Sequence, residues 1–299
     1  MCGIVGLFLK DKTLEPELGA LIAGMLGVMC DRGPDSAGFA VYGAGAPGMV
    51  KLTVRGPEGT DFAVLGARIE AATDVLVSVS PRATHAVLTV PAAEEATVRA
   101  ALAEVAPEMR IVGAGSRMEL YKEVGLPSQV ATRFALDTMS GTHAIGHTRM
   151  ATESAVTTDG AHPFSTGPDQ CLVHNGSLSN HAGVRRELER EGLRLATDND
   201  SEVAAAYLTH RMKAGDTLGE ALTHSLDDLD GFYTFVVGTE SGFGVLRDPI
   251  ACKPAVLAET DRYVAFGSEY RALVDLPGIE HAKVWEPEPG KVYFWEHAA

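Results

Sequence analysis

The chain begins with MCGIVGLFLK (residues 1–10), and this stretch decides how the rest of the sequence is interpreted. Residues 3–9 form a short apolar run that ends at Lys10, which predicts a buried strand starting one residue after Cys2. Removal of the initiator methionine would leave Cys2 with a thiol and a free α-amino group. An α-amine has an unperturbed pKa of roughly 7.7 to 8.0, so a nucleophile and a base would share one residue. A cysteine at position two is by itself a weak signal, and the motifs farther along the chain decide its meaning.

The composition is that of a globular protein. The chain has 299 residues, of which 45% are hydrophobic and 22% charged, so neither a disordered chain nor a membrane bundle fits. It carries 25 Lys and Arg against 40 Asp and Glu, a net charge of −15, without a basic run that would track phosphates. We therefore expect no nucleic-acid partner. No apolar segment is long enough to span a bilayer and the first apolar run lacks the flanks of a secretory signal, so we expect a cytoplasmic protein without membrane contact.

The spacing of cysteines and histidines gives no metal site. Cys30, Cys171 and Cys252 lie far apart in the sequence and form no Cys-x-x-Cys pair, which fits a reduced compartment; we expect them to be small buried residues without partners. His143 and His147 are four residues apart, but the residues between them lack helical character and no third ligand is evident. No nucleotide, sugar-phosphate or flavin motif is present, so we expect neither a metal nor a cofactor.

The first half of the chain alternates between apolar runs and helical patterns. Apolar residues at helical spacing predict a helix over residues 16–30, and residues 39–42 and 49–54 are expected to be extended. Residues 56–136 differ in texture, with a strand, helix and strand expected over 85–90, 93–105 and 109–112. This β-α-β unit resembles half of a ferredoxin-like module. It is either a docking or regulatory insert or a packed elaboration of the main domain, and the pattern leaves both open.

From Gly141 onward the sequence is dense in polar, glycine-marked loops between short strands. Two helices are expected, over residues 180–191 and 201–213, each with a polar start and a glycine finish. The final third, from Gly231 to the end, alternates as strands do. Together these patterns predict antiparallel sheet with helices outside, an α+β layered fold.

Five motifs occur in one order along the chain. They are MCGIVG at the start, DRGPDSAG at 31–38, GHTRMAT at 146–152, HNGSLSN at 174–180 and DSEV at 200–203. In this order the sequence resembles the class II glutamine amidotransferases, which are N-terminal-nucleophile (Ntn) hydrolases. The resemblance runs from residue 2 to about residue 270. It implies a four-layer αββα sandwich, here an amidotransferase domain over 2–299 with residues 56–136 inserted within it.

The resemblance also implies a catalytic centre. Cys2 matches the nucleophile that attacks the glutamine side-chain amide to form a thioester. The Asn175 side chain and the Gly176 backbone N–H match the donors to the oxyanion. Arg149 matches the clamp on the substrate α-carboxylate, where a planar guanidinium binds both oxygens, and Asp200 matches the acceptor for the α-ammonium group.

Three further residues are expected near this centre. Thr152 would add a hydroxyl to the substrate pocket, Arg32 would order the nucleophile's loop and favour a thiolate, and His147 would be a structural hydrogen-bonding group. Each motif also has an ordinary interpretation when taken alone. An Asn-Gly pair such as 175–176 favours a tight turn, and Asp200 is a suitable helix N-cap. Their joint occurrence in family order favours the catalytic interpretation.

The resemblance also gives expectations about partners. Family members pass ammonia to a synthase domain or subunit, and we expect no such domain within this chain. The start of the chain and the long insert look most like the stand-alone amidotransferase subunit of glutamate-synthase-like complexes, such as N-methylglutamate synthase. L-Glutamine is then the substrate. Glutamate-synthase-like partner subunits, one of them carrying a flavin, would receive the ammonia. Two alternatives stay open: a catalytically silent scaffold subunit, and a free-standing Ntn hydrolase acting on another amide.

Overall fold

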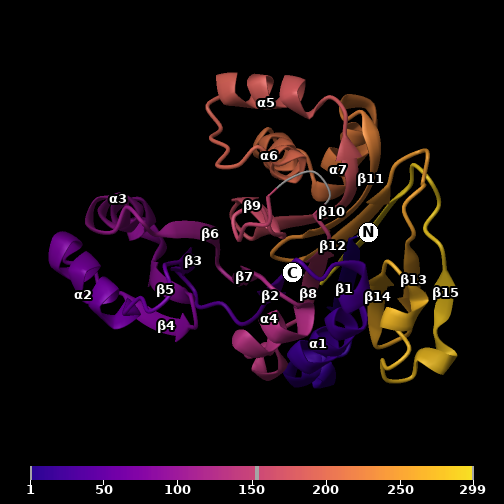
Figure 1. Cartoon of the computed structure of the whole chain (residues 1–299), viewed down its shortest axis with the longest axis horizontal. Helices are drawn as coiled ribbons and strands as arrows, with labels where there is room; N and C mark the ends of the chain where they lie inside the picture. Colours follow the sequence, from indigo (N-terminus) through magenta and orange to yellow (C-terminus); the bar gives the residue numbers. More distant parts are fainter. Residues whose placement is uncertain (1, 152–154, 298–299) are drawn as a thin grey trace.

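The computed structural model describes residues 2–151 and 155–297, and two antiparallel sheets form its centre (Figure 1). The first has seven strands in the order β15-β13-β14-β1-β8-β2-β7. The second has five strands in the order β16-β12-β11-β10-β9. The strands of the first sheet are β1 (Gly3–Leu9), β2 (Ser36–Tyr42), β7 (Met118–Val124), β8 (His143–Arg149), β13 (Val256–Glu259), β14 (Tyr263–Gly267) and β15 (Lys283–Trp285). Those of the second are β9 (Phe164–Gly167), β10 (Gln170–Leu178), β11 (Gly231–Gly238), β12 (Gly242–Arg247) and β16 (Val292–Glu296).

Helices cover the outer face of each sheet. The helices α1 (Leu18–Val28) and α4 (Pro127–Arg133) pack on the seven-stranded sheet. On the five-stranded sheet lie α6 (Asp200–Lys213) and α7 (Leu218–Asp228), and α5 (His181–Arg190) packs against α6 (Figure 1). Short 3₁₀ turns at Lys12–Glu17, Cys30–Arg32, Leu136–Thr138, Tyr270–Ala272 and Ile279–His281 connect these elements. The result is the predicted αββα sandwich of the α+β class, a prediction that the structure confirms.

The first strand shows why the layers form. All seven residues of β1 are buried, because one face packs on helices and the other on the second sheet. With the two-residue period of a strand, Val5 and Leu7 point into the core beneath α1, while Ile4 and Phe8 enter the core between the two sheets. The apolar run after Cys2 therefore fixes the end of the central strand, and with it the position of Cys2.

A third, four-stranded sheet forms a separate module at the left of Figure 1. It comprises β3 (Met49–Arg55), α2 (Phe62–Thr73), β4 (Ser78–Arg82), β5 (His85–Pro91), the 3₁₀ turn Ala92–Glu94, α3 (Glu95–Val105) and β6 (Arg110–Gly115). The strand order β4-β5-β3-β6 with two helices on one face is a whole βαββαβ unit, twice the half unit that the sequence pattern indicated. The module spans residues 49–115, whereas the expected insert spans 56–136; β7 and α4 belong to the main layers.

Other differences from the predictions are local. The helix expected from residue 16 begins at Leu18, because Pro16 lies in a preceding 3₁₀ turn. Helix α7 was not predicted; Thr217 and Glu220 form a capping box at its start. The expectation for the other cysteines was wrong in part, since Cys252 is exposed and the Sγ of Cys171 lies 3.2 Å from the Tyr42 hydroxyl.

Among the helices that the structure describes, none combines the length and the apolar character needed to cross a bilayer.

Candidate active site

A cavity of about 940 Å³ opens where β8 and β10 end and where β1 and α6 begin. Five of the predicted site residues line it: Cys2, Arg149, Asn175, Gly176 and Asp200. Arg32 and His147 are buried behind its wall and contact lining residues. Thr152 lies outside the described residues. The fold therefore brings Cys2 and Asp200, which are 198 positions apart in the sequence, to the same cavity.

Cys2 is held through its backbone. Its carbonyl oxygen accepts hydrogen bonds from Arg32 Nε at 3.0 Å and from Asn175 Nδ2 at 3.2 Å. The next residue, Gly3, pairs with Thr148 near the end of β8. The start of β1 and the end of β8 therefore lie at the same edge of the sheet, where Cys2 and Arg149 are neighbours. The Cys2 Sγ lies 3.9 Å from the carbonyl oxygen of Met150. The sulfur thus sits at the rim of the pocket beside the end of β8.

Arg32 connects the Cys2 backbone to the segment that follows β14. It is buried, and its guanidinium also forms an ion pair with Glu269, which a second cation, Arg271, contacts at 2.6 Å. The hydrogen bond from Arg32 lowers the pKa of Glu269 below its ordinary value. These contacts agree with an ordering role. The expected effect of Arg32 on the Cys2 thiolate stays a prediction, because the guanidinium contacts the Cys2 carbonyl oxygen and Glu269, and no contact of the guanidinium with the Cys2 sulfur is observed among the described residues.

The turn after Arg32 requires glycine. A Cβ on Gly33 would lie 2.4 Å from the Thr148 carbonyl carbon and 2.5 Å from the Arg149 nitrogen, so only glycine lets the turn press against β8. Two residues later, Asp35 Oδ2 accepts a hydrogen bond from the Ala151 N–H at 2.7 Å. The motif DRGPDSAG thereby fixes the chain that follows Arg149. Sequence reasoning missed Asp35, although it lies within that motif.

Asn175 and Gly176 lie within a strand and not in a tight turn. They are part of β10 and pair with Thr234 and Tyr233 of β11. Gly176 has φ +152°, and a Cβ there would lie 2.0 Å from the Phe232 carbonyl oxygen, so the position requires glycine. The alternative of an ordinary Asn-Gly turn is thus excluded, because the strand continues through the pair.

Arg149 and Asp200 supply opposite charges to the same cavity. Arg149 is the last residue of β8, is 7% exposed, and donates through Nη1 to the Ala155 carbonyl at 3.3 Å. Asp200 is the first residue of α6, but Asn199 is the N-cap, since its side chain accepts from the Ser201 N–H. The N-cap interpretation of Asp200 is therefore wrong. Its Oδ2 accepts instead from the Leu178 N–H at 2.9 Å, which ties α6 to the end of β10.

Three histidines form the floor behind these charges. His162 Nε2 and His174 Nδ1 each lie 2.9 Å from the hydroxyl of Ser201. The ring of His147 stacks on that of His162 at 4.0 Å, and its Nε2 lies 3.0 Å from the His174 carbonyl. Because a carbonyl oxygen only accepts, His147 carries its proton on Nε2. This hydrogen bond joins β8 to β10 and agrees with the structural role expected for His147, which stays a prediction. Sequence reasoning missed Ser201, although it lies in the motif DSEV.

Burial keeps these histidines neutral. It lowers the pKa of His147 to about 3 and that of His174 to about 4, and holds the pKa of His162 well below its ordinary value. In an unfolded chain each would titrate near pH 6.5. Unfolding in mild acid therefore takes up protons, and the folded state loses stability relative to the unfolded state as the pH falls.

Lowering the pH is expected to destabilise the protein in a defined window. The free energy of unfolding should begin to fall near pH 6.5, by up to about 1.4 kcal/mol per pH unit for each histidine, and level off near the folded pKa values. Urea unfolding at pH 7.5, 6.5 and 5.5 (about one unit apart, above the titration of ordinary carboxylates) measures this. Replacing the exposed His281 with glutamine should leave the profile unchanged. Equal stability at the three pH values would contradict the prediction.

The comparisons with known proteins agree with this architecture. A family model described as a glutamine amidotransferase domain matches residues 147–275. The chain is 66% identical over 297 residues to a glutamine amidotransferase-like protein, GlxB, of Rhizobium meliloti, covering 99% of each chain. It is 33% identical to a putative glutamine amidotransferase of Methanothermobacter thermautotrophicus, covering 99% of this chain and all of that one.

Solved structures show the same fold. The glutamine phosphoribosylpyrophosphate amidotransferase of B. subtilis, complexed with ADP and GMP, matches with a TM-score of 0.63 at 20% identity over 99% of this chain. This chain spans 47% of that enzyme's length. The layers thus define an Ntn-type, class II glutamine amidotransferase fold. The chain itself belongs to the glutamine amidotransferase family, as its full-length similarity to the Rhizobium meliloti and Methanothermobacter relatives shows.

Proposed function

We propose that this protein is a glutaminase subunit that hydrolyses the side-chain amide of L-glutamine with Cys2 as nucleophile. The observation that carries the proposal is the convergence of Cys2, Asn175, Arg149 and Asp200, from four separate segments, on one cavity. Its volume of about 940 Å³ is within the usual range of about 300–1,000 Å³ for small-molecule sites. The chemistry requires that Met1 be removed, because the α-amine of Cys2 serves as the base.

The bonds made and broken follow from these groups. The thiol proton passes to the α-amine, and the sulfur bonds to the side-chain carbonyl carbon of glutamine. The resulting oxyanion accepts from Asn175 Nδ2 and the Gly176 N–H. The C–N bond then breaks, and the nitrogen leaves as ammonia with a proton from the α-ammonium of Cys2. Water attacks the thioester carbon and gives a proton to the neutral amine. The C–S bond then breaks to release glutamate, and the α-ammonium returns its proton to the thiolate.

The opposite charges in the pocket select the substrate. The Arg149 guanidinium can bind both oxygens of an α-carboxylate, and the Asp200 carboxylate lies in the same cavity to accept from an α-ammonium group. A simple amide lacks both charged groups and leaves these two side chains without a ligand. We therefore assign L-glutamine as the substrate, in preference to an amide without an amino-acid head group.

We further propose that the ammonia goes to a glutamate-synthase-like partner in the cytoplasm, such as the flavin-bearing subunit of an N-methylglutamate synthase. Free ammonia is protonated in bulk water, so direct transfer to a partner would preserve the nucleophile. Copurification of the untagged complex from its native cell, with a flavin absorbance spectrum of the partner, tests this assignment. A complex that lacks any glutamate-synthase-like subunit would contradict it.

Substrate selection gives the test of the glutaminase proposal. The purified protein, with Met1 removed as shown by intact mass, should release glutamate and ammonia from L-glutamine and leave butyramide unhydrolysed. Arg149→Lys should raise KM for glutamine about 10- to 100-fold, because a lysine cannot replace the paired hydrogen bonds to a carboxylate. A coupled assay of glutamate measures KM and kcat. The matched control is Arg190→Lys, on the exposed end of α5, which should leave KM unchanged.

The outcomes separate the alternatives. Hydrolysis of both amides at similar kcat/KM would favour a free-standing amide hydrolase. Absence of hydrolysis by processed protein would contradict the glutaminase proposal and favour a silent scaffold subunit.

A further inference from the structure

One wall of the pocket is formed by residues 155–163, which we call the wall segment. Its Thr157, Asp159 and Gly160 line the cavity. The segment lies against the proposed carboxylate clamp, since Arg149 Nη1 donates to the Ala155 carbonyl at 3.3 Å. A Cβ on Gly160 would come within 3.5 Å of the same Nη1. Two points of the wall segment therefore flank the Arg149 guanidinium, and a shift of this segment would move the clamp.

A buried lysine of the main sheet holds the wall segment from below. Lys122, on β7, points its Nζ at three backbone carbonyls of the segment: Asp159 at 3.1 Å, Ala161 at 2.8 Å and Pro163 at 3.4 Å. An ammonium group has three donors, so each finds an acceptor in this one segment. The ammonium also lies 4.5 Å from the centre of the Phe164 ring. Lys122 thus fixes the backbone of the wall segment.

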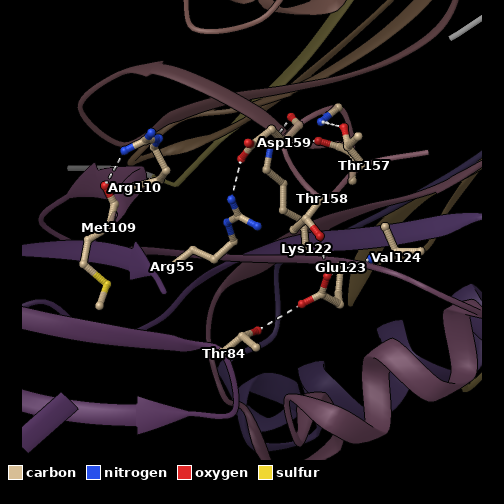
Figure 2. A network of polar contacts seen from close by, with 12 residues as sticks. Arg55, Thr84, Met109, Arg110, Lys122, Glu123, Val124, Thr157, Thr158 and Asp159 are labelled. Carbon is tan, nitrogen blue, oxygen red and sulfur yellow. Dashed lines mark hydrogen bonds and ion pairs between the residues drawn. The ribbon is translucent and has the colours of Figure 1, made fainter. Parts of the chain in front are cut away.

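The four-stranded module holds the same segment from the side, as Figure 2 shows. Arg55, the last residue of β3, forms an ion pair with Asp159 at 2.9 Å between Nη2 and Oδ1. At the start of the neighbouring strand, Thr84 donates to Glu123 Oε2 at 3.0 Å, and the other oxygen of Glu123 accepts from Thr158 of the wall segment. Arg55 pairs with His85 in the sheet, so both contacts come from one end of the module.

The ion pair between Arg55 and Asp159 also affects the charge of the pocket. The Asp159 side chain is half exposed and lines the pocket that receives the substrate carboxylate. An unpaired carboxylate there would repel that substrate group and compete for Arg149. Arg55 supplies the compensating charge. Because exposed ion pairs contribute little to folding stability, replacing Arg55 should affect the pocket more than the fold.

We propose that the four-stranded module is a functional part of the substrate site, and that Arg55 is a positioning residue that acts through Asp159 to hold the wall segment against Arg149. The inference rests on the proposed glutaminase function and adds to it that a residue outside the sandwich sets the affinity for the amino-acid head group. Lys122 holds the backbone of the wall segment and Glu123 holds the Thr158 side chain, so that this one charge pair tunes the pocket.

The test compares charge variants of the pair. Arg55→Ala should raise KM for glutamine about three- to fivefold with kcat unchanged within a factor of two, the range expected for one exposed ion pair. Arg55→Asp should raise KM further, since it places a second carboxylate beside Asp159. The double variant Arg55→Asp with Asp159→Arg should recover most of the loss, and Arg55→Lys should retain near-normal KM.

Arg110→Ala is the matched control. Arg110 lies opposite Arg55 in the same sheet but donates to carbonyls of its own module, to Met109 as Figure 2 shows and also to Pro107. The KM of the Arg110→Ala variant for glutamine should equal that of the unchanged protein. Thermal unfolding of all variants, expected to agree within a few degrees, excludes misfolding as the cause.

Binding measurements separate this inference from the proposed function. In a Cys2→Ala background, calorimetric titration with L-glutamine should show the same order of Kd values as the KM series. Glutamine binding that is equal in the Arg55→Ala, Arg55→Asp and parent proteins would overturn the positioning role while leaving the glutaminase proposal intact. Kinetic effects without recovery in the double variant would likewise overturn it. Absence of glutamine binding to the parent protein would overturn both proposals.

Discussion

Replacing Cys2 with alanine is expected to lower kcat for glutamine hydrolysis by at least about 10³-fold, because the covalent route through a thioester is lost. The binding groups Arg149 and Asp200 do not depend on the sulfur, so the Kd for glutamine should change little. Steady-state assay gives kcat, and calorimetry gives Kd for the inactive variant. This is the largest expected effect, since Cys2 is the only thiol among the described residues that line the pocket.

The control for this change is another thiol. Cys30 is also free and partly exposed but lies outside the pocket lining, so Cys30→Ala should retain activity. A glutamine-analogue electrophile should add one adduct by intact mass to the processed protein and none to Cys2→Ala. Cys252 is exposed, so a Cys252→Ser background removes incidental labelling. An adduct that persists without Cys2, or activity that survives its loss, would refute the nucleophile assignment.

Replacing Asn175 with alanine is expected to lower kcat about 100- to 1,000-fold, which corresponds to about 2.7–4 kcal/mol of transition-state stabilisation, with KM changed little. The reason is geometric. Its Nδ2 donates to the Cys2 backbone carbonyl at 3.2 Å, so the amide lies next to the proposed nucleophilic residue. A donor fixed in this place stabilises negative charge that develops only in the transition state.

Loss of the same amide also removes a contact that holds Cys2, and the control must separate the two effects. Asn180→Ala removes an asparagine from the end of the same motif; its side chain contacts Asp228 and Asp230, away from Cys2. That variant should lose some stability and keep its kcat. If Asn175→Ala raised KM and left kcat intact, Asn175 would be a substrate-binding residue and not an oxyanion donor.

Local pattern was sufficient for most of the secondary structure. The apolar run of β1, the helical spacing of apolar residues in α1, and the polar start and glycine finish of α6 depend on neighbouring residues, so the sequence displays them directly. Sequence reasoning missed helix α7 although a capping box precedes it and its buried residues recur at helical spacing. It also missed half of the module, α2 and β4. The Asn175-Gly176 pair shows the limit: its local preference is a turn, and pairing with β11 overrides that preference.

The site followed a similar division. Motifs placed Cys2, Arg149, Asn175 and Asp200 in one hypothesis, because chemistry at each position restricts the residue type. Ser201 and Asp35 sit inside the same motifs but carry no spacing signal of their own, since their partners are distant in the sequence. Their importance emerged only from the hydrogen bonds of the folded chain.

The amino-acid sequence alone determined the layer class and the residue types of the pocket, because strand periodicity and reactive side chains are local properties. Only the tertiary structure decided that Asp200 is not the N-cap of α6, that the module is a whole βαββαβ unit, and that Arg55 reaches Asp159 across 104 residues. Ion pairs and hydrogen bonds between distant segments depend on how strands pair and layers stack. Such contacts leave no periodic pattern in the sequence, so they can be identified only in the folded structure.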